Sequence, residues 1–94
     1  MLVGEVIHVD DFGNVITNIH ETEVEQLGIK ETIKIKFKSK TLKLGLQGAY
    51  AEVASRKPLA IIGSHNFLEI SINKGNAGKV FNAESGDKIT VLRR

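Results

Sequence analysis

Hydrophobic and polar residues alternate most regularly in the stretch TIKIKFKSKTLKLGL, residues 32–46. Apolar residues occupy every second position and lysines fill most of the positions between them, which is the period-2 pattern of a strand with one buried face. The alternation breaks at Ser39 and Lys40 and resumes with Leu42. The stretch therefore predicts a β-hairpin with an apolar inner face and a lysine-rich outer face.

Short β-branched runs predict further strands elsewhere in the chain. These runs are LVGEVIHV (2–9), VITNI (15–19), YAEVA (50–54), PLAIIGSHNFLEISI (58–72), which turns around residues 63–66, and SGDKITVL (85–92), where a turn precedes the last strand. Between the first two runs, DDFGN (10–14) is predicted to turn the chain.

One segment, ETEVEQLGI (21–29), is the only helical candidate. Thr22 and Glu25 have the spacing of a capping box, and Gly28 suits a C-terminal stop. We expect one or two helical turns there, and an irregular glycine-rich loop over NKGNAGKVF (73–81).

The number of strands sets the fold class. About seven short strands are too many for a flat sheet in a chain of 94 residues, whereas closure into a barrel removes exposed strand edges. We therefore expect an all-β fold, a small closed antiparallel β-barrel with one short helical turn. No linker, repeat or low-complexity segment divides the chain, so residues 1–94 are predicted to form a single domain.

Composition narrows the functional classes. The chain has no cysteine, which excludes disulfides and thiolate chemistry, and its 13 Lys+Arg against 11 Asp+Glu give a formal charge of +2, too small to indicate nucleic-acid binding by itself. No apolar run approaches the roughly 20 residues of a membrane span, and the N-terminus lacks a signal-peptide pattern. We expect a soluble, cytoplasmic protein that does not associate with a membrane.

Catalytic motifs are missing. His8, His20 and His65 share no metal-ligand spacing, and there is neither a nucleophile elbow nor a phosphate-binding loop. Asp10 and Asp11 are adjacent, and adjacent side chains on a strand point to opposite faces. We therefore expect no metal site and no catalytic residue in the chain alone.

Two readings without a small-molecule substrate remain open. Lysines along the hairpin could follow a phosphate backbone, as in barrels that bind single-stranded nucleic acid; these are Lys34, Lys36, Lys38, Lys40 and Lys43. However, such sites interleave aromatic rings for stacking, and none lies on this outer face, which favours a solvated strand. The other reading is an oligomerisation module that binds no ligand.

Three stretches together resemble a known family. GEVIHVDDFGNVITNI (4–19), AYAEV (49–53) and IGSHNFLEISINKGNAG (62–78) are similar to the C-terminal barrel domain of the S-adenosylmethionine hydroxide adenosyltransferases. These enzymes hydrolyse S-adenosylmethionine to adenosine and methionine, and the fluorinase and chlorinase share their fold. The resemblance implies a substrate-binding domain without a cofactor. It also implies that water is activated by an absent N-terminal domain, contributed by a neighbouring subunit of a homotrimer.

The resemblance also implies roles for the turn and the second stretch. Asp10 matches an acidic contact to the methionine ammonium of S-adenosylmethionine. Phe12 and Tyr50 match aromatic rings that pack around the adenine, and Asn14 matches an amide that reads an adenine edge. Asp11 stands where a basic residue is more typical, and we expect its charge to face solvent.

The third stretch supplies the remaining expectations. Ser64 matches the position that holds the methionine carboxylate, and the backbone near Asn76 and Ala77 matches the segment that meets the Watson–Crick edge of adenine. The halogenating relatives carry an arginine at the position of His65, so a histidine favours the hydrolase branch. For Glu69, contact with the methionine end and a plain surface position both remain open.

Overall fold

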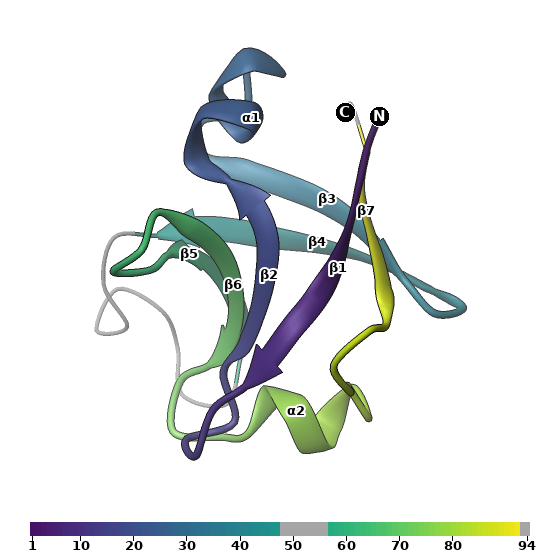
Figure 1. Cartoon of the computed structure of the whole chain (residues 1–94). Helices are drawn as coiled ribbons and strands as arrows, with labels where there is room; N and C mark the ends of the chain where they lie inside the picture. Colours follow the sequence, from purple (N-terminus) through teal and green to yellow (C-terminus); the bar gives the residue numbers. More distant parts are fainter. Residues whose placement is uncertain (48–56, 93–94) are drawn as a thin grey trace.

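Seven strands close into a barrel in the order β1-β2-β6-β5-β4-β3-β7. The structure is a computed structural model and describes residues 1–47 and 57–92 (Figure 1). The elements are β1 (Leu2–Val9), β2 (Val15–His20), α1 (Glu21–Gln26), β3 (Thr32–Phe37), β4 (Lys40–Gln47), β5 (Pro58–Ile62), β6 (Phe67–Ile72), α2 (Ala77–Val80) and β7 (Lys88–Leu92). The predicted closed seven-stranded barrel is confirmed, and the stretch YAEVA (50–54) lies outside the described residues.

The sequence predicted a purely antiparallel barrel, but the barrel contains one parallel pair of strands. Six neighbouring pairs are antiparallel, and β4 pairs with β5 in parallel, with Leu46 opposite Ala60. The physical reason is topological. A closed ring with an odd number of strands cannot alternate direction at every neighbour, so at least one pair must be parallel.

The helical predictions need two corrections. The N-cap of α1 is His20, whose ring Nδ1 accepts from the Thr22 backbone N–H while Glu23 Oε1 accepts from the His20 backbone N–H, so the predicted Thr22/Glu25 capping box is wrong. Gly28 does follow the helix end, with a φ of +76°. The second correction is α2, a single turn in the segment predicted as irregular. One turn is too short for a helical period to show in the sequence.

The core confirms the alternation seen in the sequence. On β3, Ile33, Ile35 and Phe37 are buried, while Lys34 and Lys36 are exposed. Equivalent inward positions on the other strands complete one cluster, with Val6, Val15, Ile19, Leu44, Leu68, Ile70, Ile89 and Val91 among its members. No helix within the described ranges is long and apolar enough to cross a membrane.

Two irregularities shape the side of the barrel formed by β1, β2 and β6. In β1 the pairing with β2 shifts between Val6 and His8, so that both Ile7 and His8 are exposed. In β2 the pairing with β6 shifts between Ile16 and His20. Such bulges re-aim side chains and interrupt the ladder, which leaves backbone groups that need other partners.

Thr17 supplies one of those partners. Its side chain is fully buried, its hydroxyl donates to the Leu68 carbonyl at 2.8 Å, and it accepts from the Ile19 backbone N–H at 3.2 Å. The next residue, Asn18, accepts from the Glu5 backbone N–H at 2.9 Å through its side-chain oxygen. Thr17 and Asn18, which belong to the stretch GEVIHVDDFGNVITNI (4–19), are therefore part of the barrel's hydrogen bonding.

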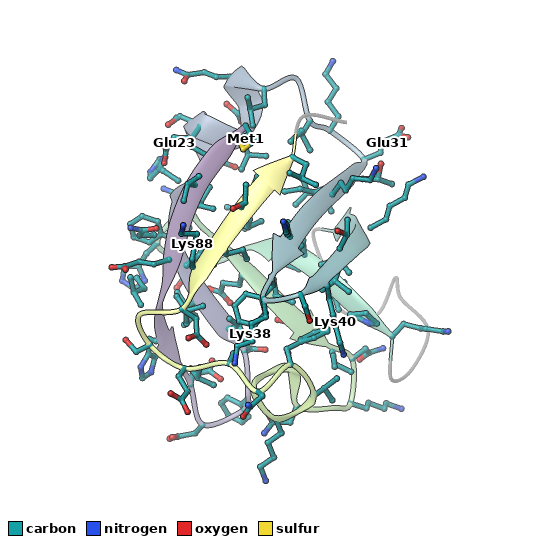
Figure 2. All side chains as sticks on the ribbon, turned by 90° about the vertical axis from the view of Figure 1, so that its right-hand side faces the viewer. Met1, Glu23, Glu31, Lys38, Lys40 and Lys88 are labelled. Carbon is teal, nitrogen blue, oxygen red and sulfur yellow. The ribbon has the colours of Figure 1, made fainter. Side chains whose placement is uncertain are left out.

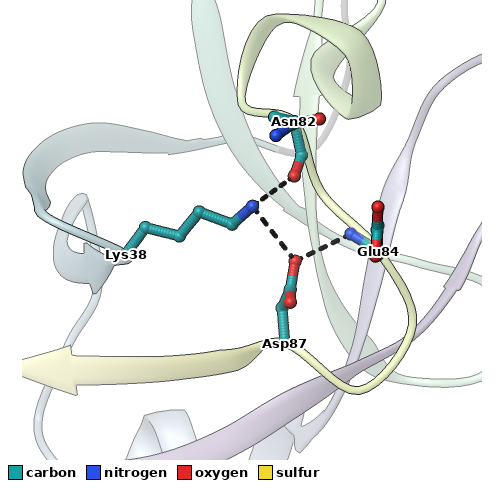
Figure 3. A network of polar contacts seen from close by, with 4 residues as sticks. All are labelled: Lys38, Asn82, Glu84 and Asp87. Carbon is teal, nitrogen blue, oxygen red and sulfur yellow. Dashed lines mark hydrogen bonds and ion pairs between the residues drawn. The ribbon is translucent and has the colours of Figure 1, made fainter.

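Lys38 leaves the lysine-rich outer face. It occupies a left-handed turn position with a φ of 56°. Its ammonium donates to the Asn82 carbonyl at 2.5 Å and lies 3.6 Å from the Asp87 carboxylate, which in turn accepts from the Glu84 backbone N–H (Figure 3). Lys38 thus ties the β3–β4 turn to the loop before β7, so one lysine of the predicted row is engaged in contacts within the protein.

We predict that Thr17→Val destabilises the fold. The substitution keeps the side-chain volume but leaves the Leu68 carbonyl and the Ile19 N–H without their hydroxyl partner, at a cost of about 1–3 kcal/mol. Urea unfolding measures the change. The matched control is Thr41→Val on the exposed face of β4, with an expected effect within about 0.5 kcal/mol. Equal effects of the two substitutions would contradict this role of Thr17.

Candidate functional site

The turn between β1 and β2 is built around the Asp10 carboxylate. Its Oδ1 accepts from the backbone N–H groups of Phe12 and Asn14, both at 2.9 Å, and its Oδ2 accepts from Asn14 Nδ2 at 2.9 Å. Gly13 takes a φ of +84°, which a residue with a Cβ rarely adopts. The carboxylate therefore has a fixed position and orientation.

Two neighbouring elements hold this turn in place. From β6, the buried Ser71 hydroxyl donates to Asn14 Oδ1 at 2.8 Å. From the start of α2, the Gly78 N–H donates to the Gly13 carbonyl at 2.8 Å, and a Cβ on Gly13 would collide with the side chain of Asn76. The turn, β6 and α2 thus form one supported unit at one end of the barrel (Figure 1).

A groove of about 490 Å³ begins at this turn and runs over the outer face of the barrel. Apolar side chains form part of its lining, namely Ile7, Ile16, Ile61 and Phe67. Its polar groups are Asp10, Ser64, His65 and Glu69. Strand register explains the arrangement, because Ile16 of β2, Glu69 of β6 and Ile61 of β5 lie opposite one another in a single row.

Glu69 lies over the β5–β6 turn. The Glu69 carboxylate occupies the space that a Cβ on Gly63 would fill, so a larger residue at this position would displace it. The turn itself is closed by the Asn66 N–H, which donates to the Gly63 carbonyl at 3.0 Å. Beside it, Ser64 Oγ lies 3.3 Å from His65 Nδ1. The turn thus places a hydroxyl and an imidazole next to the glutamate.

The two carboxylates differ in their electrostatics. Burial opposes ionisation of Asp10, but the hydrogen bonds from Asn14 and Phe12 outweigh it, so its pKa lies below the ordinary 3.8. For Glu69, burial and the nearby charge of Asp10 raise the pKa above the ordinary 4.5, with His65 opposing them. Two acidic groups beside an apolar lining suit a ligand with a positive charge and an apolar body.

The structure brings together four of the predicted site residues in this groove, namely Asp10, Ser64, His65 and Glu69. Phe12 lies at the tip of the turn and is 80% exposed. Asn76 caps α2 by accepting from the Lys79 N–H at 2.9 Å, and the adjacent Ala77 is fully buried. Tyr50 lies outside the described residues.

Asn14 has a structural task that the sequence did not reveal. Its side chain donates to Asp10 and accepts from Ser71, so it couples the carboxylate to β6. Ser71 was not predicted as part of the site, because a serine on a strand gives no signal of what it contacts on the neighbouring strand. The position of Ile16 in the groove was predictable from strand alternation. Val15 and Thr17 on either side of it are buried, so Ile16 faces outward.

The chain matches the family model described as the S-adenosylmethionine hydroxide adenosyltransferase C-terminal domain over residues 4–90. Among curated proteins it is 37% identical over 92 residues to the (R)-S-adenosyl-L-methionine hydrolase of Methanocaldococcus jannaschii, covering 93% of this chain and 34% of that protein. It is 30% identical over 95 residues to the fluorinase of Nocardia brasiliensis, covering 96% of this chain and 32% of that protein. The chain therefore spans about a third of the length of these relatives.

Solved structures agree on the fold. An uncharacterised conserved protein from Thermotoga maritima superposes with a TM-score of 0.90 at 33% identity, over 96% of this chain and 35% of that one. A conserved hypothetical protein from Thermus thermophilus gives a TM-score of 0.74 at 26% identity, over 96% of this chain and 34% of that one.

We predict opposite pKa shifts for the two groove carboxylates, below 3.8 for Asp10 and above 4.5 for Glu69. Stability from Asp10 should be fully present above its ordinary pKa and be lost as the pH falls through its lower folded-state pKa. Carbon-detected NMR titration of the two carboxyl groups measures both values. Asn14→Ala removes one donor to Asp10 and should move the Asp10 pKa upward. An Asp10 pKa at or above 3.8 in the unsubstituted chain would contradict the described turn.

Proposed function

The chain belongs to the family of S-adenosylmethionine hydroxide adenosyltransferase C-terminal domains, and on that premise we propose that it is the substrate-binding domain of an S-adenosylmethionine hydrolase. The reaction yields adenosine and L-methionine. The proposal goes beyond the family assignment, because it gives roles to residues of the groove and of the supported turn.

The observation that carries the proposal is the fixed Asp10 carboxylate. Three hydrogen bonds favour its ionised form, and it faces a groove lined in part by Ile7, Ile16 and Ile61. A carboxylate already held in position loses little conformational freedom when it binds an ammonium group. The methionine end of S-adenosylmethionine offers an ammonium group and a sulfonium on a short aliphatic chain, which matches this combination.

The β5–β6 turn is the proposed site for the other charges at the methionine end. Ser64 would donate its hydroxyl to the methionine carboxylate, with His65 beside it. Glu69 would face the cationic part of the substrate. Its pKa is raised by burial and, to a lesser extent, by repulsion from the nearby charge of Asp10. An approaching positive charge would relieve that repulsion and lower the Glu69 pKa.

The adenine would lie at the tip of the β1–β2 turn. An aromatic residue that is 80% exposed, as Phe12 is, offers a ring face for stacking. Asn14 is proposed to read an adenine edge in addition to supporting Asp10, and the backbone near Asn76 and Ala77 would meet the Watson–Crick edge. Tyr50 is proposed as the second ring around the base.

The mechanism of this domain would be positional. Holding both ends of the substrate fixes the ribose carbon bonded to sulfur for in-line attack by water, and such positioning contributes several kcal/mol, up to about 7–11 in well-oriented cases. Activation of the water is assigned to an N-terminal domain, contributed by a neighbouring subunit of a homotrimer. The chain alone should therefore bind substrate weakly and release no adenosine.

The hydrolase is preferred to a halogenating enzyme. The curated hydrolase is 37% identical to this chain and the fluorinase is 30% identical. The family resemblance also implies an arginine in the halogenating relatives at the position of His65. Both arguments favour water as the nucleophile.

We predict that S-adenosylmethionine at millimolar concentration shifts the amide NMR signals of residues 10–14 and 63–69. Asp10→Ala should weaken this binding at least tenfold, since a charge-assisted hydrogen bond is worth about 1.5–3 kcal/mol. The control is Asp11→Ala, which removes the adjacent exposed carboxylate and should leave binding unchanged. Shifts confined to other residues, no shifts at all, or equal effects of the two substitutions would overturn the proposal.

A further inference from the structure

A second groove, of about 530 Å³, lies far from the Asp10 turn. It is bordered by the loop that follows α1, by the start of β3 and by the end of β7, and it shares no lining residue with the first groove. In Figure 1, α1, the start of β1 and the end of β7 lie at the opposite end of the barrel from α2 and the β1–β2 turn. The second groove is therefore a different surface from the proposed substrate site.

Three lysines line this groove, and two of them oppose each other directly. Lys34 of β3 pairs with Lys43 of β4 in the strand register, and Lys30 comes from the preceding loop. Like charges directly opposite on neighbouring strands destabilise a sheet. All three side chains are exposed, so they can move to meet a ligand.

The protein itself offers these ammonium groups little neutralisation. Among residues 1–47 and 57–92, the one ion pair within 4 Å joins Lys38 to Asp87, outside this groove. Of the described residues that line the groove, Glu31 is the single acidic one, and its side chain is exposed at the start of the β3–β4 hairpin (Figure 2). The groove therefore carries an excess of positive charge.

We propose that this groove binds a phosphate-bearing anion. Lysine ammonium groups bind phosphate oxygens as point charges, and the Thr32 hydroxyl adds a donor within the same lining. Ile29 and Leu92 provide apolar contact, and the volume lies within the range of about 300–1,000 Å³ typical of small-molecule sites. Among the described residues, no aromatic ring lines the groove, which disfavours a base-stacking strand of nucleic acid.

The anion would also relieve the repulsion between Lys34 and Lys43. Binding and stability should therefore be linked, and each lysine has two separable effects. Removal of one charge should stabilise the unliganded chain and at the same time weaken its response to the anion. A solvated lysine face without a ligand would show the first effect and not the second.

The test measures thermal unfolding of the chain with pyrophosphate, compared with sulfate at equal ionic strength. Pyrophosphate at about 100 times its dissociation constant should raise the melting temperature by roughly 10 °C or more. Lys43→Gln should raise the melting temperature without pyrophosphate by a few degrees and weaken pyrophosphate binding roughly three- to tenfold. The matched control is Lys40→Gln, on the same strand but outside the groove lining, which should change neither.

Further ligands separate the sources of the phosphate. Uridine triphosphate that binds as tightly as pyrophosphate means that the phosphates alone are recognised, and tighter binding means that the apolar wall contacts the nucleoside; either result supports the proposal.

A pyrophosphate response equal to that of sulfate, or one unchanged by Lys43→Gln, would overturn the proposal. Binding of an oligothymidylate without binding of pyrophosphate would also overturn it, in favour of a nucleic-acid surface. None of these outcomes depends on Asp10, so Asp10→Ala should retain the response.

Discussion

The hydrogen bonding of one carboxylate is the constraint on which the candidate site depends. Asp10 accepts from two backbone N–H groups and one side-chain amide within five residues of chain, and the same amide is anchored by Ser71 of the neighbouring strand β6. The arrangement needs a left-handed Gly13 without a side chain, because Asn76 of the α2 cap occupies the adjacent space. A short turn is thereby as firmly placed as a strand, which is what a binding group requires if it is to lose little freedom on binding.

The barrel brings the rest of the groove to this carboxylate. Strand order places β2 beside β6 and β6 beside β5, so residues separated by about fifty positions in the chain share one outward row. The bulge in β1 leaves Ile7 exposed at the side of that row. The buried Thr17 hydroxyl offsets the interrupted ladder in β2, and this explains why a polar residue belongs in the core. The register shifts in β1 and β2 therefore lie in the same strands that supply Ile7 and Ile16 to the groove.

Local pattern predicted much of the fold, and non-local geometry accounts for the rest. Alternation identified the β3–β4 hairpin and its inner face, because burial imposes a period of two on the sequence, and β-branched runs with a turn at 63–66 identified β5 and β6. It could not give the parallel pairing of β4 with β5, which follows from closing an odd number of strands. It also missed the cap at His20 and the single turn of α2, since one turn has no period. The support of Asn14 by Ser71 joins positions 57 residues apart, and no local signal connects them. The family resemblance selected Asp10, Ser64, His65 and Glu69, and strand register explains why those four meet.

The most direct test of this account is a crystal structure of the chain grown in saturating S-adenosylmethionine. We expect the ammonium of the substrate within hydrogen-bonding distance of Asp10, the adenine against Phe12, and the contacts from Phe12 and Asn14 to the carboxylate unchanged. An empty groove at saturation, or a substrate bound elsewhere on the barrel, would contradict the claim that the turn is a prearranged binding group.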